Sequence, residues 1–171
     1  LPLALHLAFS YLLQYKQIIS PSEYLTQLQN PDLLNHPSLQ GNGLSPTEHT
    51  QHVWRTFALS YDKLDPLQER DNLALNLLIR VAHFAPGEPI WRELLVKTLG
   101  TSTHTDNFSL KVHDAFLRLI ELGLIDAEEN DVLRMHRLVA AFVQDVAGDE
   151  VAATLERVEQ VVFEEALRVN E

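Results

Sequence analysis

The feature that most constrains the fold of this chain is a change of hydrophobic period between residues 124 and 136. On both sides of this stretch, apolar residues recur every three or four positions, as they do on the buried face of a helix. Within the stretch, the runs LIDA and VLRMH flank the polar residues EEND, and this pattern predicts a short β-hairpin. The chain is therefore expected to be mainly α, with one small β element.

Three helices are predicted before the hairpin and one after it. The three cover residues 67–84, 89–100 and 108–123, and each ends at a glycine or at a turn that contains one. The order of three helices, a hairpin and a further helix is that of a winged-helix domain. We therefore predict a winged-helix domain for residues 65–147, with the hairpin as its wing.

The preceding segment, residues 1–64, is predicted to form a small helical bundle. Pro2 suits the first turn of its first helix, where the missing N–H is no loss. Ser20 and Glu23 have the spacing of a capping box at the start of a second helix. Residues 31–46, rich in proline and glycine, are predicted to be a loop, after which the helical period resumes. The apolar face expected of the first helix comprises Leu3, Leu5, Leu7, Ala8, Tyr11, Leu12 and Tyr15.

A last helix is predicted for residues 148–171, since apolar residues there recur with helical spacing and charged residues fill the other positions. The positions expected to be buried are Val151, Leu155, Val158, Val162 and Ala166. We expect this helix to connect to a C-terminal sensor or repeat region. Because the chain starts within a helix and without methionine, we expect it to be a piece of a longer protein.

The charge of the chain restricts its partners. The formal net charge is -11 at pH 7, and residues 1–60 hold only three acidic and two basic side chains, so most of the negative charge follows them. Such a surface repels phosphate backbones, and we expect no nucleic-acid binding. The absence of cysteine excludes disulfides and fits a cytoplasmic protein. No apolar run approaches the roughly 20 residues that span a bilayer, so no membrane association is expected.

Motifs for catalysis and metal binding are few. His49 and His52 are close enough on a predicted helix to share a metal, but no nearby residue supplies further ligands, and no metal site is predicted. Solvent-facing polar side chains are the simpler interpretation. The sequence contains neither a GxSxG motif nor GxxxxGK[ST], the phosphate-binding P-loop. We therefore expect no enzyme activity and no catalytic residue in this chain taken alone.

The segment VLRMHRLV places a histidine and an arginine where the second strand of the hairpin meets the next helix. Side chains alternate faces along a strand, so Leu133 and Met135 are expected to point inward and Val132, Arg134 and His136 outward. Two interpretations of His136 follow. In one it has a structural role, capping the strand and bonding a backbone carbonyl; in the other it contacts a ligand.

A winged helix first suggests DNA binding, in which the third helix enters the major groove. The third predicted helix offers Lys111 and Arg118, but it also carries Asp114 and Glu121. The wing, residues 127–131, contains three acids. Both elements that would face DNA are neutral or acidic, so a DNA-binding winged-helix transcription regulator is the alternative rather than the preferred function.

Four motifs, taken in order, resemble those of a known family. They are LPLAL at the start of the first bundle, TFALSYDKL at its end, FAPGEPI in the next domain and MHRLV after the wing. The chain thus resembles the STAND signalling ATPases of the NB-ARC type over nearly its whole length. In that family a P-loop nucleotide-binding domain precedes a helical domain and a winged-helix domain, and a sensor region follows. The resemblance implies that residues 1–64 and 65–147 are the second and third of these domains.

The resemblance also implies nucleotide-binding roles for particular residues. Pro2 matches the family's proline that packs against the adenine base, and His136 matches the histidine that contacts the β-phosphate of ADP in the closed state. Arg137 stands where the family has an acid, and it would lie near the phosphate. The cofactor of the full-length protein would be ADP or ATP with Mg²⁺, and none is expected for this chain alone.

The function implied is regulatory. The two domains would close over ADP in the autoinhibited state and move on activation, which permits nucleotide exchange and homo-oligomerisation. The expected partners are the preceding nucleotide-binding domain and the following sensor domain of the same chain. The physical chemistry agrees, since the positive end of a helix dipole beside His136 and Arg137 favours an anion. An interaction scaffold without a nucleotide is a third hypothesis.

Overall fold

The structure is a computed structural model that describes residues 2–30, 48–100 and 106–168. Of Pro2, residues 48–52 and Asp106, the backbone is described and the side chain is not. The loop predicted for residues 31–46 lies outside the described residues. The described part is mainly helical with one small antiparallel sheet, and this confirms the predicted fold class at that level.

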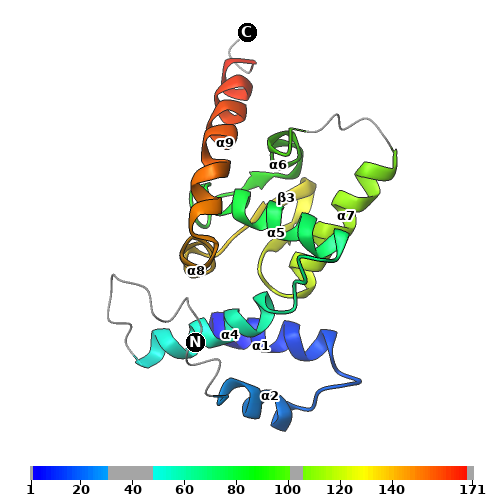
Figure 1. Cartoon of the computed structure of the whole chain (residues 1–171), viewed down its shortest axis with the longest axis vertical. Coiled ribbons are helices and arrows are strands. Elements are labelled where there is room, and N and C mark those ends of the chain that lie inside the picture. Colours follow the sequence, from blue (N-terminus) through cyan, green and yellow to red (C-terminus); the bar gives the residue numbers. More distant parts are fainter. Residues whose placement is uncertain (1, 31–47, 101–105, 169–171) are drawn as a thin grey trace.

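The N-terminal helices form the lower layer of the molecule in Figure 1. They are α1 (Pro2–Gln14), α2 (Pro21–Leu28) and α4 (Glu48–Tyr61). The predicted capping box begins α2: the Ser20 hydroxyl accepts a hydrogen bond from the Glu23 N–H at 3.2 Å, and the Glu23 carboxylate accepts one from the Ser20 N–H at 2.7 Å. Leu7 and Tyr11 of α1 are fully buried, whereas Leu5 is 64 % exposed. The buried face of α1 is therefore narrower than predicted.

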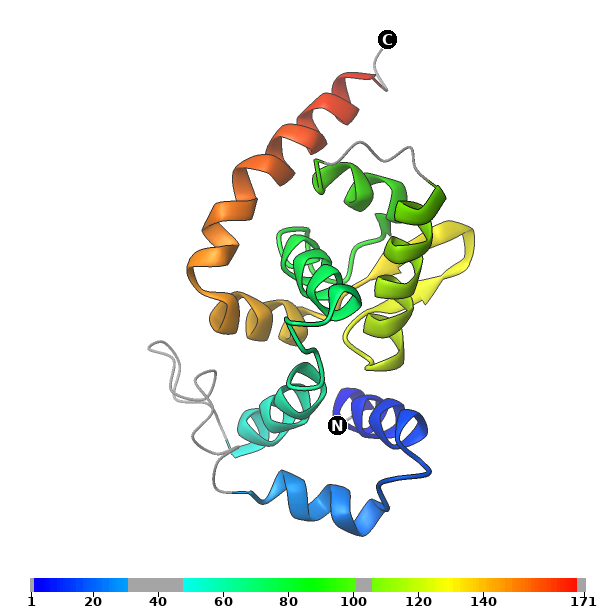
Figure 2. The same ribbon diagram turned by 45° about the vertical axis from the view of Figure 1, so that its right-hand side comes forward.

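Helix α5 (Glu69–Val81) is central to the upper part of the molecule (Figure 2). The helices that pack against it are α6 (Arg92–Thr98), α7 (Asp106–Glu121), α8 (Arg137–Ala147) and α9 (Asp149–Arg168). Its buried residues cover more than one face, as expected of a helix with neighbours on several sides. In α9 the buried positions are Val158 and Val161, while Leu155 and Val162 are partly exposed, so the helix is rotated relative to the prediction.

The sheet contains β1 (Ile90–Trp91), β2 (Asp126–Glu128) and β3 (Val132–Arg134) in the order β1-β3-β2, with antiparallel neighbours. The predicted hairpin is confirmed, since β2 and β3 pair with Ala127 opposite Leu133. The helix predicted to begin at Pro89 begins only at Arg92. Ile90 pairs with Leu133 instead, because strand pairing satisfies the backbone groups on the second edge of β3 and buries the Ile90 side chain.

One buried apolar cluster extends through the N-terminal helices and the upper part of the molecule. The Phe142 ring of α8 lies 5.8 Å from the ring of Trp54 and 5.7 Å from those of Phe57 and Tyr61, all in α4. Packing therefore continues across residue 64, where the two domains are predicted to meet. The division of the chain into those domains stays a prediction.

Candidate functional site at the strand-to-helix corner

His136 lies between β3 and α8 and is the N-cap residue of the helix. Its imidazole Nδ1 accepts a hydrogen bond from the Leu138 N–H at 3.1 Å, and its carbonyl oxygen accepts from the N–H groups of Val139 and Ala140. The side chain is exposed, whereas that of Met135 is buried, as alternation along the strand predicts. His136 thus has a capping role, but its side chain bonds a helix N–H and not a strand carbonyl.

The capping bond determines which ring nitrogen of His136 carries the proton. Because Nδ1 accepts a hydrogen bond, the neutral imidazole holds its proton on Nε2. Burial lowers the pKa of His136 below the ordinary value of 6.5, the charge of Arg137 lowers it further, and Asp126 opposes both. At neutral pH the ring is therefore uncharged, and its Nε2–H donates to none of the described residues.

Arg137 is the first residue of α8 and is exposed beside His136. The first turn of α8 itself contains no acidic residue, although the negative charge of Asp126 on β2 reaches His136. A neutral donor, a guanidinium and a helix N-terminus in one place favour an anion such as a phosphate group. Pro2, the third predicted site residue, begins α1, and its side chain lies outside the described part of the structure.

Helix α1 contacts the hairpin through Asp126. The His6 Nε2 atom on α1 lies 3.3 Å from the Asp126 Oδ1 atom on β2, with both side chains about half exposed. The charge of Asp126 also acts on His136. The Asp126 carboxylate thus contacts α1 directly and influences His136 through its charge. An exposed pair of this kind contributes little to the stability of the protein.

His6 and Asp126 are residues of this site that sequence reasoning missed. Neither belongs to a recognisable motif, and they are far apart along the chain. One hint was present, because His6 interrupts an apolar helix about one turn after Pro2. A single sequence gives no signal that a hairpin carboxylate lies beside that histidine.

The basic residues of α7, the helix that would enter DNA, are paired with acids of α5. The Nε atom of Arg118 lies 3.3 Å from the Asp71 Oδ1 atom, and both side chains are buried. The Nη2 atom of Arg118 also donates to the Lys63 carbonyl at 2.9 Å. Lys111 forms an ion pair with Glu69 at the surface. The buried Arg118 is therefore not available to a phosphate, and Lys111 already lies beside a carboxylate.

Metal and membrane sites receive no support from the described residues. Across residues 2–30, 48–100 and 106–168, no group of three or more His, Asp or Glu side chains is placed to hold a metal ion. The side chains of His49 and His52 lie outside that description, although α4 contains both residues. No helix in the described ranges is both long enough and apolar enough to cross a bilayer.

Comparison with known proteins gives no relative. The chain matches no protein-family model, no curated protein and no solved structure. The interpretation of the site therefore rests on its geometry: His136 caps α8 beside Arg137, and the His6–Asp126 pair joins α1 to the hairpin.

Proposed function

We propose that this chain is the helical and winged-helix region of a STAND-type signalling ATPase, and that it closes over ADP held mostly by a preceding domain. The observation that carries the proposal is the state of His136. Its Nδ1 is engaged by the Leu138 N–H, so the proton on Nε2 is available to a phosphate oxygen. Loss of that contact on activation would permit ADP to exchange and the full-length protein to form homo-oligomers in the cytoplasm.

The order of elements from α5 to α8 supports a winged-helix domain. β1 lies between the first and second of the three helices and pairs with β3, so the hairpin is attached to the helical part through a third strand. The turn of the hairpin carries exposed Glu129 and Asp131. Together with the paired cations of α7, these acids favour a domain that faces protein over the alternative, a DNA-binding regulator.

A preceding domain in the same chain is supported by α1. Three apolar side chains of α1, spaced four residues apart, are exposed: Leu5 by 64 %, Phe9 by 65 % and Leu13 by 53 %. They form an apolar row along one side of the helix, opposite the buried Leu7 and Tyr11 side. Exposed apolar rows of this kind mark contact surfaces. In the proposed protein the nucleotide-binding domain covers this row.

The corner fits the charge of the proposed cofactor. The His136 Nε2–H, the Arg137 guanidinium and the α8 N-terminus would hold the β-phosphate of ADP, and Pro2 would contact the adenine. The chain has no P-loop, so Mg²⁺ binding and any ATP hydrolysis belong to the preceding domain. Contacts from this chain would then control how long ADP stays bound.

The test separates the capping role of His136 from phosphate binding in the full-length protein. Asparagine is a good N-cap residue, so His136→Asn keeps an acceptor for the Leu138 N–H but removes the Nε2 donor. Release of a fluorescent ADP analogue should accelerate by about 10- to 100-fold, since a hydrogen bond to a charged acceptor contributes roughly 1.5–3 kcal/mol. Urea unfolding should show almost no change in stability.

Two further variants complete the experiment. His136→Ala removes both roles, so ADP release should accelerate similarly and the free energy of unfolding should fall by about 1 kcal/mol. His113→Asn, at an exposed position on α7, controls for the loss of a histidine and should change neither quantity. If the rate of ADP release from the His136→Asn protein is unchanged, His136 serves only as a helix cap and the proposal is wrong.

A further inference from the structure

The outward face of the small sheet is a surface distinct from the corner at His136. Trp91 lies opposite Val132, and Val132 lies opposite Glu128, so their side chains form one row across the three strands. Because side chains alternate faces, this row is on the opposite side of the sheet from Ile90 and Leu133, which are buried in the core. Trp91 is 60 % exposed, although indole is among the largest apolar surfaces a side chain can offer.

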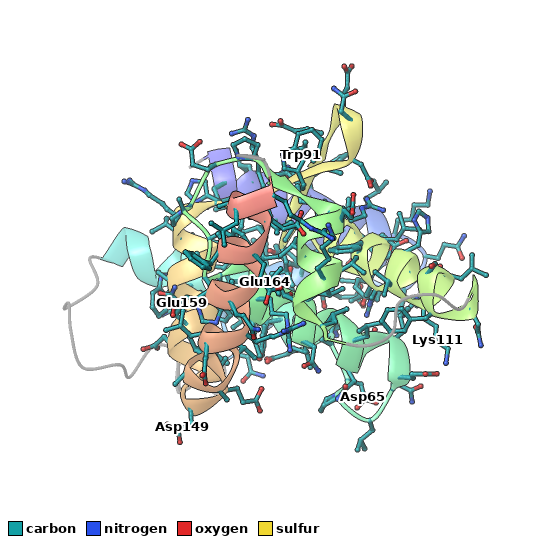
Figure 3. The ribbon with its side chains drawn as sticks, turned by 90° about the horizontal axis from the view of Figure 1, so that it is seen from above. Asp65, Trp91, Lys111, Asp149, Glu159 and Glu164 are labelled. Carbon is teal, nitrogen blue, oxygen red and sulfur yellow. The ribbon has the colours of Figure 1, made fainter. Side chains whose placement is uncertain are left out.

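An open groove of about 970 Å³ lies along this row. The apolar part of the groove is lined by Pro89, Trp91, Ala127 and Val132, of which Val132 is only 9 % exposed, and its polar edge by Glu128, Glu129 and Asn130. We call this surface the wing groove. Figure 3 shows Trp91 beside the hairpin, away from Glu159 and Glu164 on α9.

The acids around the wing groove differ in whether they are already paired. Glu128 forms an ion pair with Arg134, and Asp131 lies 3.0 Å from the Arg92 Nε atom. Glu129 has no ion-pair or hydrogen-bond partner among the described residues. The groove thus combines an exposed indole with a carboxylate that lacks a counterion, on a chain of net charge -11.

We propose that the wing groove binds an arginine-containing segment of a partner protein. The planar guanidinium stacks on an indole face, and its parallel N–H groups pair with a carboxylate, so the Trp91 indole and the Glu129 carboxylate that line the wing groove both suit arginine side chains. Lysine fits less well because its ammonium is compact and strongly hydrated. Nucleic acids and anionic lipid surfaces are repelled by the same carboxylates that attract arginine.

The test uses the whole chain and short synthetic peptides that differ only in carrying arginine, lysine or glutamate at the same positions. In an NMR titration, the arginine peptide should shift the indole N–H signal of Trp91. The signal of Trp54 should stay in place, because its indole nitrogen is buried. The lysine peptide should bind more weakly, the glutamate peptide should not bind, and added salt should weaken the arginine complex.

Variants locate the binding to the wing groove. Trp91→Ala should weaken binding of the arginine peptide about tenfold, as expected for the loss of a cation–π contact with indole. Glu129→Gln should weaken it about fivefold, and both side chains are exposed, so the melting temperature should change little. Trp91→Phe keeps an aromatic face and should retain most of the binding. Leu110→Ala on α7 and Glu156→Gln on α9, which change an exposed apolar and an exposed acidic residue elsewhere, should have no effect.

Two results would overturn the proposal. Equal binding of the arginine and lysine peptides that persists in the Trp91→Ala and Glu129→Gln proteins would mean general attraction to an acidic chain. Binding of duplex DNA or of anionic phosphatidylserine vesicles that depends on Trp91 would assign the groove to a different class of partner.

Discussion

At the scale of single residues, Gly123 shows how closely α1 approaches the turn after α7. Its φ is +70°, a conformation that residues with a side chain rarely adopt. A Cβ atom at this position would lie 3.1 Å from Ser10 Cβ and 3.4 Å from the Leu7 side chain, both on α1. The position therefore requires glycine both for its backbone conformation and for space.

Gly123→Ala should lower the free energy of unfolding by about 3 kcal/mol, combining left-handed backbone strain with crowding against α1. Gly87→Ala is the matched control, since Gly87 has φ +82° and a Cβ atom there would have no described neighbour within 4 Å. That variant should lose only the strain component, about 1 kcal/mol. Urea denaturation of both proteins measures the difference. Equal losses would mean that α1 moves aside without cost.

Residue-level features differ in how far the sequence predicts them. The capping box at Ser20 was predicted correctly because its hydrogen bonds connect residues three positions apart. The outward position of His136 followed from strand alternation in the same way. The burial of Arg118 and the contact of His6 with Asp126 could not be predicted, because each depends on residues brought together from distant parts of the chain.

At the scale of elements, α9 is held against α5 and α6 by polar contacts as well as by buried valines. The His83 Nε2 atom, just after α5, lies 2.8 Å from the Thr154 hydroxyl. The Lys97 Nζ atom of α6 lies 3.0 Å from the Glu165 carboxylate. Burial lowers the pKa of His83; the hydrogen bond with the Val151 backbone opposes this. The positive charge of Arg80 lowers the pKa of His83 further, and the negative charge of Glu159 raises it.

This pKa shift predicts a dependence of stability on pH. The unfolded chain binds a proton at His83 more readily than the folded protein does, so the contribution of His83 is complete above pH about 6.5 and is lost as the pH falls toward the folded-state pKa. The pKa of His136 is shifted in the same direction. The free energy of unfolding should therefore be lower at pH about 5.5 than at about 7.5, as urea unfolding would measure.

His83→Gln should make this pH dependence shallower, because glutamine does not titrate. His113→Gln, at an exposed position of α7, is the control and should keep the slope. Acidic groups act in a different range: the pKa of Glu165 is lowered, first by its hydrogen bond with Lys97, so its contribution is lost only below about 4.5. A slope unchanged by His83→Gln would contradict the role assigned to His83.

The elements themselves were predicted where the pattern within a segment decides the structure. The helices and the hairpin follow from the hydrophobic period, and the hairpin is closed by its own short turn. β1 was missed, because a two-residue strand is determined by its pairing with β3 much later in the chain. The buried face of α9 was predicted with an error in rotation, since α5 and α6 determine which side is covered.

At the scale of the whole molecule, Arg118 connects the N-terminal helices to the rest of the structure. Its guanidinium contacts the Tyr15 hydroxyl after α1 at 3.3 Å, the Lys63 carbonyl after α4 at 2.9 Å, and Asp71 of α5. The side chains of Arg118 and Asp71 are 8 % and 6 % exposed. Removing water from two charges is unfavourable, so this pair is stable only while both partners are present.

Asp71→Ala should lower the free energy of unfolding by roughly 3–5 kcal/mol, because it leaves the Arg118 guanidinium buried without its carboxylate. Adding Arg118→Leu should recover part of the loss, and a double-mutant cycle in urea measures the coupling. Asp114→Ala removes an exposed acid of α7 and should change stability by less than about 0.5 kcal/mol. Additive losses in the cycle would show that the two side chains do not depend on each other.

The close packing of α1 against Gly123 also has a consequence for folding kinetics. Ser10 and Gly123 lie far apart along the chain, and closing a loop of that length is unfavourable until α7 and the turn after it have formed. Contacts completed late in folding act mainly on the unfolding rate. We therefore expect a weakened attachment of α1 to raise the unfolding rate while the refolding rate stays almost unchanged, which stopped-flow measurements on the Gly123→Ala protein would test.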